Sequence, residues 1–245
     1  MQSFGNEIDT RVQLFADPNT IVRRICREWT SFYEGIQRDG VFSELSTEGL
    51  LATTTQCSSD NGLLEYSQER LPFVAYPHEW SPSMFRDAAH TCLDLHEWLF
   101  KHSLCLIDSH CWNIVFDGAT PRWVDITSIS PYSALVVKAS LGQFRTNFLN
   151  PLKMFSLGYD DVVRSMLSHT FEMIPNDLIN GAMPRRPYKS GRLTHAVNLV
   201  ADPLRRLASR VNDRNSLQQL DRIDFTAKEN AVSALRHLRA SIDRV

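Results

Sequence analysis

A stretch near the middle of the chain repeats its apolar residues three and four positions apart. Pro82 follows Ser81 near the start of this stretch, where a proline is tolerated in the first turn of a helix. The spacing predicts a helix from about Ser83 to Lys101 with one apolar face. That face is formed by Phe85, Ala89, Cys92, His96, Leu99 and Phe100.

The first 80 residues have a more mixed pattern. Ile21, Ile25, Trp29 and Phe32 are at helical spacing behind Asn19 or Thr20 as a helix cap, which predicts a helix of about four turns from residue 19. Residues 41–74 instead carry short apolar pieces separated by Ser, Asp, Asn, Gly and Pro, a pattern typical of strands and turns.

After Lys101 the apolar pattern changes from helical to strand-like. Leu104–Ile107 predicts a short strand, and Ile114–Phe116 and Arg122–Ile126 predict the two arms of a hairpin around an Asp-Gly turn. Helical spacing then returns from Pro131 to the end of the chain. The pattern indicates an α+β fold, with a reduced N-terminal lobe in residues 1–80 and a mainly helical lobe in residues 81–245 that carries the hairpin unit, residues 104–126.

Charge and composition restrict the classes of partner. The chain has 245 residues, 43% of them hydrophobic, a formal net charge of -2 and a pI near 6.4. These values allow a substantial core but give no general attraction to nucleic acid or to an anionic membrane, so neither is an expected partner. The basic run Pro184–Arg192 is interpreted as a solvated loop, with phosphate or RNA binding as the alternative.

The apolar segments and the spacing of the cysteines favour a cytoplasmic location for the protein. No apolar run approaches the roughly 20 residues that a membrane helix needs, and the first ten residues lack a basic segment followed by an apolar one. Five cysteines are spread along the chain with no C-x-x-C pair. An odd number without paired spacing predicts unpaired thiols in a reducing compartment.

Three polar residues stand at the ends of the short strands predicted after Lys101. Asp108 follows the first strand, Asn113 precedes the hairpin, and Asp125 ends its returning arm. Because a hairpin holds its arms roughly 5 Å apart, Asn113 and Asp125 are expected to lie side by side. Such a pair of oxygen ligands suits Mg²⁺, which completes its octahedron with water and phosphate oxygens. Asp108 on the connecting loop could then accept the proton of a substrate hydroxyl during phosphoryl transfer.

An Asp-x4-Asn spacing followed by a hairpin that ends in Asp resembles the catalytic loop and metal-binding aspartate of the protein-kinase-like fold. Over about Leu63 to Leu157 the chain is also similar to the N-terminal, kinase-like region of a bacterial family of class I SAM-dependent methyltransferases related to nodulation proteins. The resemblance rests on RLPFVAYPHEW, DAAHTCLDLHEW, LIDSHCWNIVF, PRWVDITSISPY and GQFRTNFLNPL. It implies a domain that uses ATP and Mg²⁺, with Asp108 as the base and Asn113 and Asp125 as metal ligands.

The chain departs from both resemblances. No strand followed by a glycine-rich loop and an acidic strand end occurs after Pro151, so the methyltransferase domain is missing and methyl transfer is not expected. Kinases hold the α and β phosphates with a lysine of the N-terminal lobe, whereas no lysine precedes Lys101 here. Arg38 or Arg70 could supply the charge, although a guanidinium does not replace an ammonium group without rearrangement.

Two functions therefore remain open at this stage. One is a phosphotransferase that acts on a small-molecule or protein acceptor, favoured by the intact Asp108, Asn113 and Asp125 set. The other is a degenerate, pseudokinase binding module that works with a SAM-dependent methyltransferase, favoured by the missing lysine. Trp80 also has two interpretations, as an aromatic residue beside a nucleotide or as part of the packing between lobes. His90 and His96 are six positions apart, which turns them away from each other on a helix and excludes a shared metal.

Overall fold

The computed structural model describes residues 2–4, 11–16, 18–58, 63–71, 73–169, 174–176, 179, 220 and 223–245. Contacts divide the chain into two compact units, each built from two segments. The first unit consists of Met1–Ala75 and Trp112–Ile129, and the second of Tyr76–Cys111 and Ser130–Val245. Sheet and helix together give the α+β class expected from the sequence.

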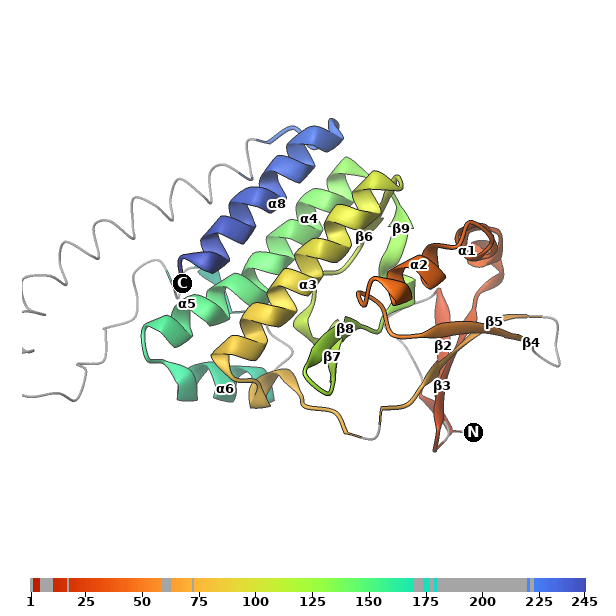
Figure 1. Ribbon diagram of the computed structural model, residues 1–245, viewed down its shortest axis with the longest axis horizontal. Coiled ribbons are helices and arrows are strands. Elements are labelled where there is room, and N and C mark those ends of the chain that lie inside the picture. Colours follow the sequence, from red (N-terminus) through yellow and green to blue (C-terminus); the bar gives the residue numbers. More distant parts are fainter. Residues whose placement is uncertain are drawn as a thin grey trace, which may run out of the picture. The chain divides into compact units, whose positions relative to one another are not determined.

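A five-stranded antiparallel sheet forms the body of the first unit (Figure 1). In spatial order its strands are β1 (Gln2–Phe4), β2 (Val12–Ala16), β3 (Thr20–Ile25), β5 (Leu64–Glu69) and β4 (Thr54–Ser58). The central strand β3 pairs with β2 on one side and β5 on the other, so that Arg23 lies opposite Leu14 and Tyr66. Helices α1 (Arg27–Arg38) and α2 (Val41–Thr47) belong to the same unit.

Residues 19–38 correct one expectation from the sequence. The predicted helix from residue 19 is wrong over Thr20–Ile25, which is strand β3, and α1 begins only at Arg27. Ile21, Val22 and Ile25 are β-branched and suit a strand, and a strand with neighbours on both sides has its backbone groups paired along both edges. The four-residue spacing of Ile21 and Ile25 fits a strand face as well as a helix face.

The region from residue 41 to residue 74 contains both strands and a helix. Strand β5 confirms the strand prediction for one apolar piece, and β4 overlaps only the end of another. Val41–Thr47 is instead the short helix α2, which buries Val41, Phe42 and Leu45 on one side. These buried residues are three and four positions apart, which is helical spacing, although the sequence around them has the pattern of strands.

The predicted hairpin is present as β7 (Ile114–Asp117) and β8 (Thr120–Trp123), joined through Gly118 at a φ of 62°. Its contacts group it with the first unit, whereas the sequence analysis assigned it to the helical lobe. Backbone hydrogen bonds provide the reason. Trp123 donates its N–H to the Leu50 carbonyl at 2.9 Å and accepts one from Ala52 at 2.8 Å.

Helices form most of the described part of the second unit (Figure 1). The predicted helix is confirmed as α3 (Pro82–Lys101), whose first turn is capped by the Ser81 hydroxyl accepting from the Met84 N–H at 3.2 Å. After α3 comes β6 (Leu104–Leu106), which pairs with β9 (Ile129–Pro131). The later helices are α4 (Ala134–Phe144), the π-helix η4 (Arg145–Leu149), α5 (Asn150–Ser156), α6 (Asp160–His169) and α8 (Lys228–Asp243).

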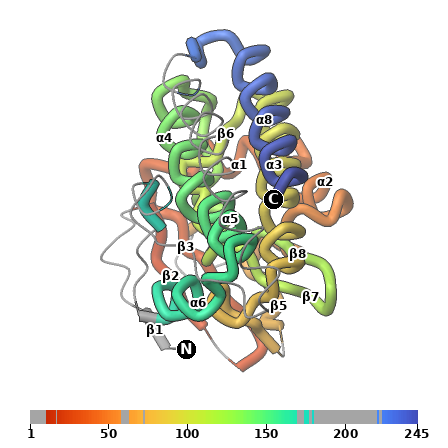
Figure 2. Tube along the Cα trace, turned by 90° about the vertical axis from the view of Figure 1, so that its left-hand side faces the viewer, coloured from red at the N-terminus to blue at the C-terminus, as the bar shows by residue number. Residues whose placement is uncertain are grey.

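Helices α3 and α8 run side by side in the second unit, as Figure 2 shows. Arg239 of α8 joins them by an ion pair with Asp94 of α3, whose nitrogen and oxygen are 2.6 Å apart. The helices expected after Pro131 are confirmed for α4, α5, α6 and α8. The helix expected in residues 201–212 and the basic run Pro184–Arg192 lie outside the described residues.

Two further expectations can be compared with the structure. All five cysteines fall within the described residues, and none of them forms a disulfide there, as the sequence predicts. Among the helices of the described ranges, none combines the length and apolar character needed to cross a membrane.

Candidate functional site

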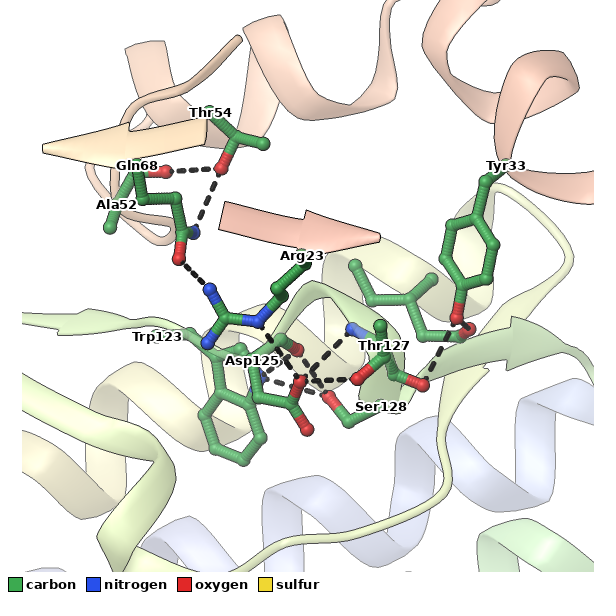
Figure 3. Close-up of polar contacts among 10 residues, drawn as sticks. Arg23, Tyr33, Ala52, Thr54, Gln68, Trp123, Asp125, Thr127 and Ser128 are labelled. Carbon is green, nitrogen blue, oxygen red and sulfur yellow. Dashed lines mark hydrogen bonds and ion pairs between the residues drawn. The ribbon is translucent and has the colours of Figure 1, made fainter. Parts of the chain in front are cut away.

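Asp125 stands at the point where β8 ends and a short 3-10 helix, η3 (Ile126–Ser128), begins in the first unit. Its Oδ1 atom accepts two hydrogen bonds from Thr127, one from the backbone N–H at 3.1 Å and one from the hydroxyl at 2.6 Å (Figure 3). This is the side-chain cap of η3, and it fixes the direction of the carboxylate. The strand-end position of Asp125 is therefore a defined turn.

The backbone around Asp125 is held as firmly as its side chain. The Asp125 carbonyl accepts from the Trp123 indole N–H at 2.8 Å and from the Ser128 hydroxyl at 2.7 Å. The Tyr33 hydroxyl of α1 lies 3.1 Å from the Thr127 carbonyl and 3.2 Å from the Ile129 carbonyl, so it donates to this pair of acceptors. Trp123 and Tyr33 are both fully buried, which makes these bonds inaccessible to competing water.

Arg23 of β3 brings a positive charge to this turn (Figure 3). Its Nε lies 3.9 Å from Asp125 Oδ1, and the two side chains are 10% and 24% exposed. One terminal nitrogen of Arg23 donates to the Gln68 side-chain carbonyl. Gln68 in turn donates to the Thr54 hydroxyl at 2.9 Å. A line of polar groups thus runs from β4 across β5 and β3 to Asp125.

The electrostatics of the turn are set by burial and by this pairing. Burial lowers the pKa of the Arg23 guanidinium from its ordinary value, and the Asp125 charge opposes that shift. A guanidinium starts so far above neutrality that it stays charged in a protein. Within the described part of the chain, the side-chain contacts of Asp125 go to Oδ1. The turn thus offers a fixed cation and a carboxylate whose Oδ2 is not used in those contacts.

Asn113 is the last residue of the 3-10 helix η2 (Cys111–Asn113) and also belongs to the first unit. Its carbonyl accepts from the Val124 N–H at 2.9 Å, and the next residue, Ile114, lies opposite Trp123. The backbone therefore sets Asn113 across from the residue immediately before Asp125, as the hairpin argument requires. The role of the two side chains as a metal pair stays a prediction.

Asp108 lies in the second unit, between β6 and η2, and is partly buried. Burial raises the pKa of the neighbouring Cys92 thiol, and the Asp108 charge adds to that rise. The residue after it, Ser109, donates its backbone N–H to the Gln143 side chain of α4 at 2.7 Å. The loop that carries Asp108 is therefore anchored to α4, while its role as a base stays a prediction.

Arg23 is the residue that reasoning from the sequence missed. Of the two arginines considered, Arg38 is exposed at the end of α1 beside Asp39, and Arg70 follows β5 with its backbone N–H on the Asn19 carbonyl. Strand alternation was the available signal. In TIVRRI it places Arg23 on the same face as the buried Ile25, a position where an unpaired charge would be costly.

Two other sequence candidates have packing roles in the second unit. Trp80 is fully buried with its ring against Phe85 of the same unit, the centroids 5.1 Å apart, and both of its interpretations from the sequence stay predictions. His90 and His96 have different partners, because His90 pairs with Asp243 and His96 with Ser109. Nowhere in the described ranges do three or more His, Cys, Asp or Glu side chains gather as a metal cluster would require.

Comparisons with known proteins give a sequence relative and structural neighbours, one of which is a kinase domain. No protein-family model matches the chain. The chain is 28% identical over 169 residues to nodulation protein NoeA of Rhizobium meliloti (strain 1021), a match that covers 69% of this chain and 34% of NoeA. The kinase domain of Mycobacterium tuberculosis PknI superposes with a TM-score of 0.47 and 13% identity, over 99% of this chain and 93% of that domain. The chain thus resembles a part of NoeA and spans about a third of its length.

Proposed function

We propose that this chain is a protein-kinase-like domain that binds the phosphates of Mg-ATP at the Asp125 turn and transfers a phosphoryl group to a small-molecule or protein acceptor. Asn113 and Asp125 are the metal ligands, and Asp108 is the base for the acceptor hydroxyl. Arg23 takes the phosphate-binding role that a lysine of the N-terminal lobe has in kinases. The observation that carries the proposal is the approach of Arg23 Nε to Asp125 Oδ1 at 3.9 Å.

The chemistry of this pair suits a metal-bound phosphate. Two unit charges about 4 Å apart attract by roughly 4 kcal/mol at an effective dielectric constant of 20, so the pair holds Arg23 near the turn when no ligand is present. Asp125 would hold the metal, and the Arg23 guanidinium could then pair with a phosphate oxygen, since its planar fork matches phosphate geometry. Neither charge is then left unpaired, which is the condition for burying charged groups.

The turn is rigid enough to hold a metal ligand in place. Thr127 fixes the carboxylate, and Trp123 and Ser128 fix the backbone carbonyl of Asp125. Mg²⁺ requires near-ideal octahedral geometry and keeps several waters, so it needs few protein ligands in fixed positions. Asn113 enters the proposal because the hairpin pairs its backbone with Val124.

A second candidate function is a degenerate binding module that works beside a SAM-dependent methyltransferase. The observation that favours it is the same ion pair, because Arg23 already compensates the Asp125 charge without a metal. The absence of any lysine before Lys101 points the same way. In this case the domain would recognise an anionic ligand or a partner without transferring phosphate.

A thermal-shift series separates the two functions. The protein is heated with ATP, with ADP and without nucleotide, each with and without Mg²⁺. Mg-ATP at about 100 times its dissociation constant should add roughly 2.7 kcal/mol to the folded state. Asp125→Ala should remove this stabilisation, whereas Asp108→Ala should keep it and abolish phosphate transfer. Asp117→Ala is the matched control, since Asp117 is an exposed aspartate on the same hairpin, paired with Arg122.

Each outcome selects one interpretation. No shift in any condition would reject the phosphotransferase and leave the binding module. A shift that needs nucleotide but no Mg²⁺, and is lost in Arg23→Gln, would indicate a metal-free anion site. A shift without phosphate transfer would indicate a pseudokinase.

A further inference from the structure

A buried polar cluster in the second unit joins the loop that carries Asp108 to two helices. Its members are His96 of α3, Ser109 of the loop and Ser140 of α4, and all three are fully buried. His96 Nε2 is 2.7 Å from Ser109 Oγ, and Ser109 Oγ is 2.6 Å from Ser140 Oγ. Two helices are therefore joined through one loop hydroxyl.

The loop has two further anchors, at the backbone of Ser109 and at Cys111. The Ser109 N–H donates to the Gln143 side chain at 2.7 Å, and the Cys111 thiol lies 3.8 Å from Asn147 Oδ1. Ser109 and Cys111 are buried. Asp108, which precedes them, and His110, which lies between them, are only partly buried. Ser109 and Cys111 thus hold the loop against the helices.

The available donors and acceptors decide which atom donates in each hydrogen bond of the cluster. Burial lowers the pKa of His96 to about 3, so its ring is neutral near pH 7 and carries one N–H. Nδ1 of His96 is buried and has no hydrogen-bond partner among the described residues. A buried N–H without an acceptor is rarer than an acceptor without a donor, which places the proton on Nε2. His96 then donates to Ser109, and Ser109 donates to Ser140.

We propose that His96, Ser109 and Ser140 form a directed hydrogen-bond chain that fixes the backbone at Asp108, so that His96 is a positioning residue for the proposed base. The hydroxyl of Ser109 is suited to the central place, because it can accept from His96 and donate once, to Ser140. The importance of this hydrogen-bond chain for catalysis rests on the proposed function. The hydrogen bonds themselves can be tested without measuring phosphate transfer.

The test uses nuclear magnetic resonance on the full chain, with labelled histidine nitrogens and aspartate carboxyl carbons. The wild type should show His96 as the Nε2–H tautomer, with a slowly exchanging Ser109 amide. His96→Leu and Ser109→Ala should speed Ser109 amide exchange at least tenfold and shift the Asp108 carboxyl resonance. His96→Gln, whose amide can donate from about the same position, should restore much of both signals. His237→Gln is the matched control on the exposed face of α8, where the ring of His237 bonds to the Ser233 carbonyl of its own helix.

The outcomes distinguish this inference from the proposed function. An Nδ1–H tautomer, or unchanged Ser109 exchange and Asp108 resonance in both Ser109→Ala and His96→Leu, would overturn the positioning role even if the wild type transfers phosphate. If transfer is observed, His96→Leu should lower kcat tenfold or more without changing the KM for ATP, and His96→Gln should recover it. If no transfer is observed, the proposed function fails. The tautomer and exchange results still decide whether the hydrogen bonds from His96 through Ser109 to Ser140 are formed as proposed.

Discussion

Arg23 and Asp125 place opposite charges 3.9 Å apart within the first unit, one from the central strand of the sheet and one from the turn after the hairpin. Both side chains are largely withdrawn from solvent, so the pair differs from an exposed ion pair, which salt and water weaken. Gln68 on β5 occupies another nitrogen of the same guanidinium. The sheet and the turn after the hairpin are thus joined by a polar connection, while the backbone bonds of Trp123 join the hairpin to Leu50 and Ala52.

Removing the Arg23 guanidinium should destabilise the first unit more than removing an exposed one. Arg23→Met keeps much of the apolar stem but leaves Asp125 and Gln68 without this partner, and breaking a buried pair costs about 3–5 kcal/mol. Urea unfolding at pH 7 measures the change. Arg38→Met is the control, because Arg38 is 79% exposed beside Asp39 and should alter stability by less than about 1 kcal/mol. Equal effects of the two variants would contradict a structural role for the Arg23 pair.

Tyr33 should contribute to the turn through its hydroxyl alone. Tyr33→Phe keeps the buried ring and removes the donor shared by the Thr127 and Ile129 carbonyls, which should cost about 1–2 kcal/mol in unfolding free energy. If the turn holds the metal ligand, the same variant should also weaken the stabilisation by Mg-ATP. Tyr76→Phe is a suitable control, since Tyr76 is 50% exposed. A Tyr33→Phe protein as stable as the wild type would show that the two carbonyls find other donors.

Thr127 allows the carboxylate contact to be tested without changing the charge. Thr127→Val keeps the shape of the side chain and the backbone N–H bond to Asp125, and removes only the hydroxyl bond of 2.6 Å. We expect a loss of about 1–2 kcal/mol in stability, because the bond is made to a charged acceptor. The control variant is Thr226→Val, which removes a similar but exposed hydrogen bond of 2.6 Å to Asp224. The two variants should differ most in Mg-ATP binding, which Thr226→Val should leave unchanged.

The local pattern was sufficient for elements that are specified by their own sequence. The α3 face and the hairpin follow directly from spacing and turn residues, and the structure confirms both, although the second arm, β8, ends at Trp123 and not at Ile126. Strand β3 was mistaken for a helix because its identity depends on β2 and β5, which lie on either side of it and are not visible in a local window. The contacts of the hairpin with Leu50 and Ala52 are likewise non-local.

The candidate site follows the same division. Asp108, Asn113 and Asp125 could be selected because they stand at the ends of short strands within one stretch of sequence. Arg23 could not be selected in this way, because its relation to Asp125 arises only when the sheet and the hairpin pack together. His96 looked like one of several helix histidines, and only its burial and its contact with Ser109 distinguish it.

His96 should make the stability of the protein depend on pH in the acid range. Burial lowers its pKa from 6.5 to about 3 in the folded chain, so between these values the unfolded chain binds a proton at this residue and the folded chain does not. Stability therefore falls as the pH is lowered from about 6.5, and the part due to His96 reaches roughly 5 kcal/mol near pH 3. Urea unfolding of the wild type and His96→Gln at pH 7, 5.5 and 4 measures that part as the difference in slope. His237→Gln is the control for a substitution at an exposed histidine, and a His96→Gln protein with the wild-type slope would mean that His96 is protonated normally in the folded chain.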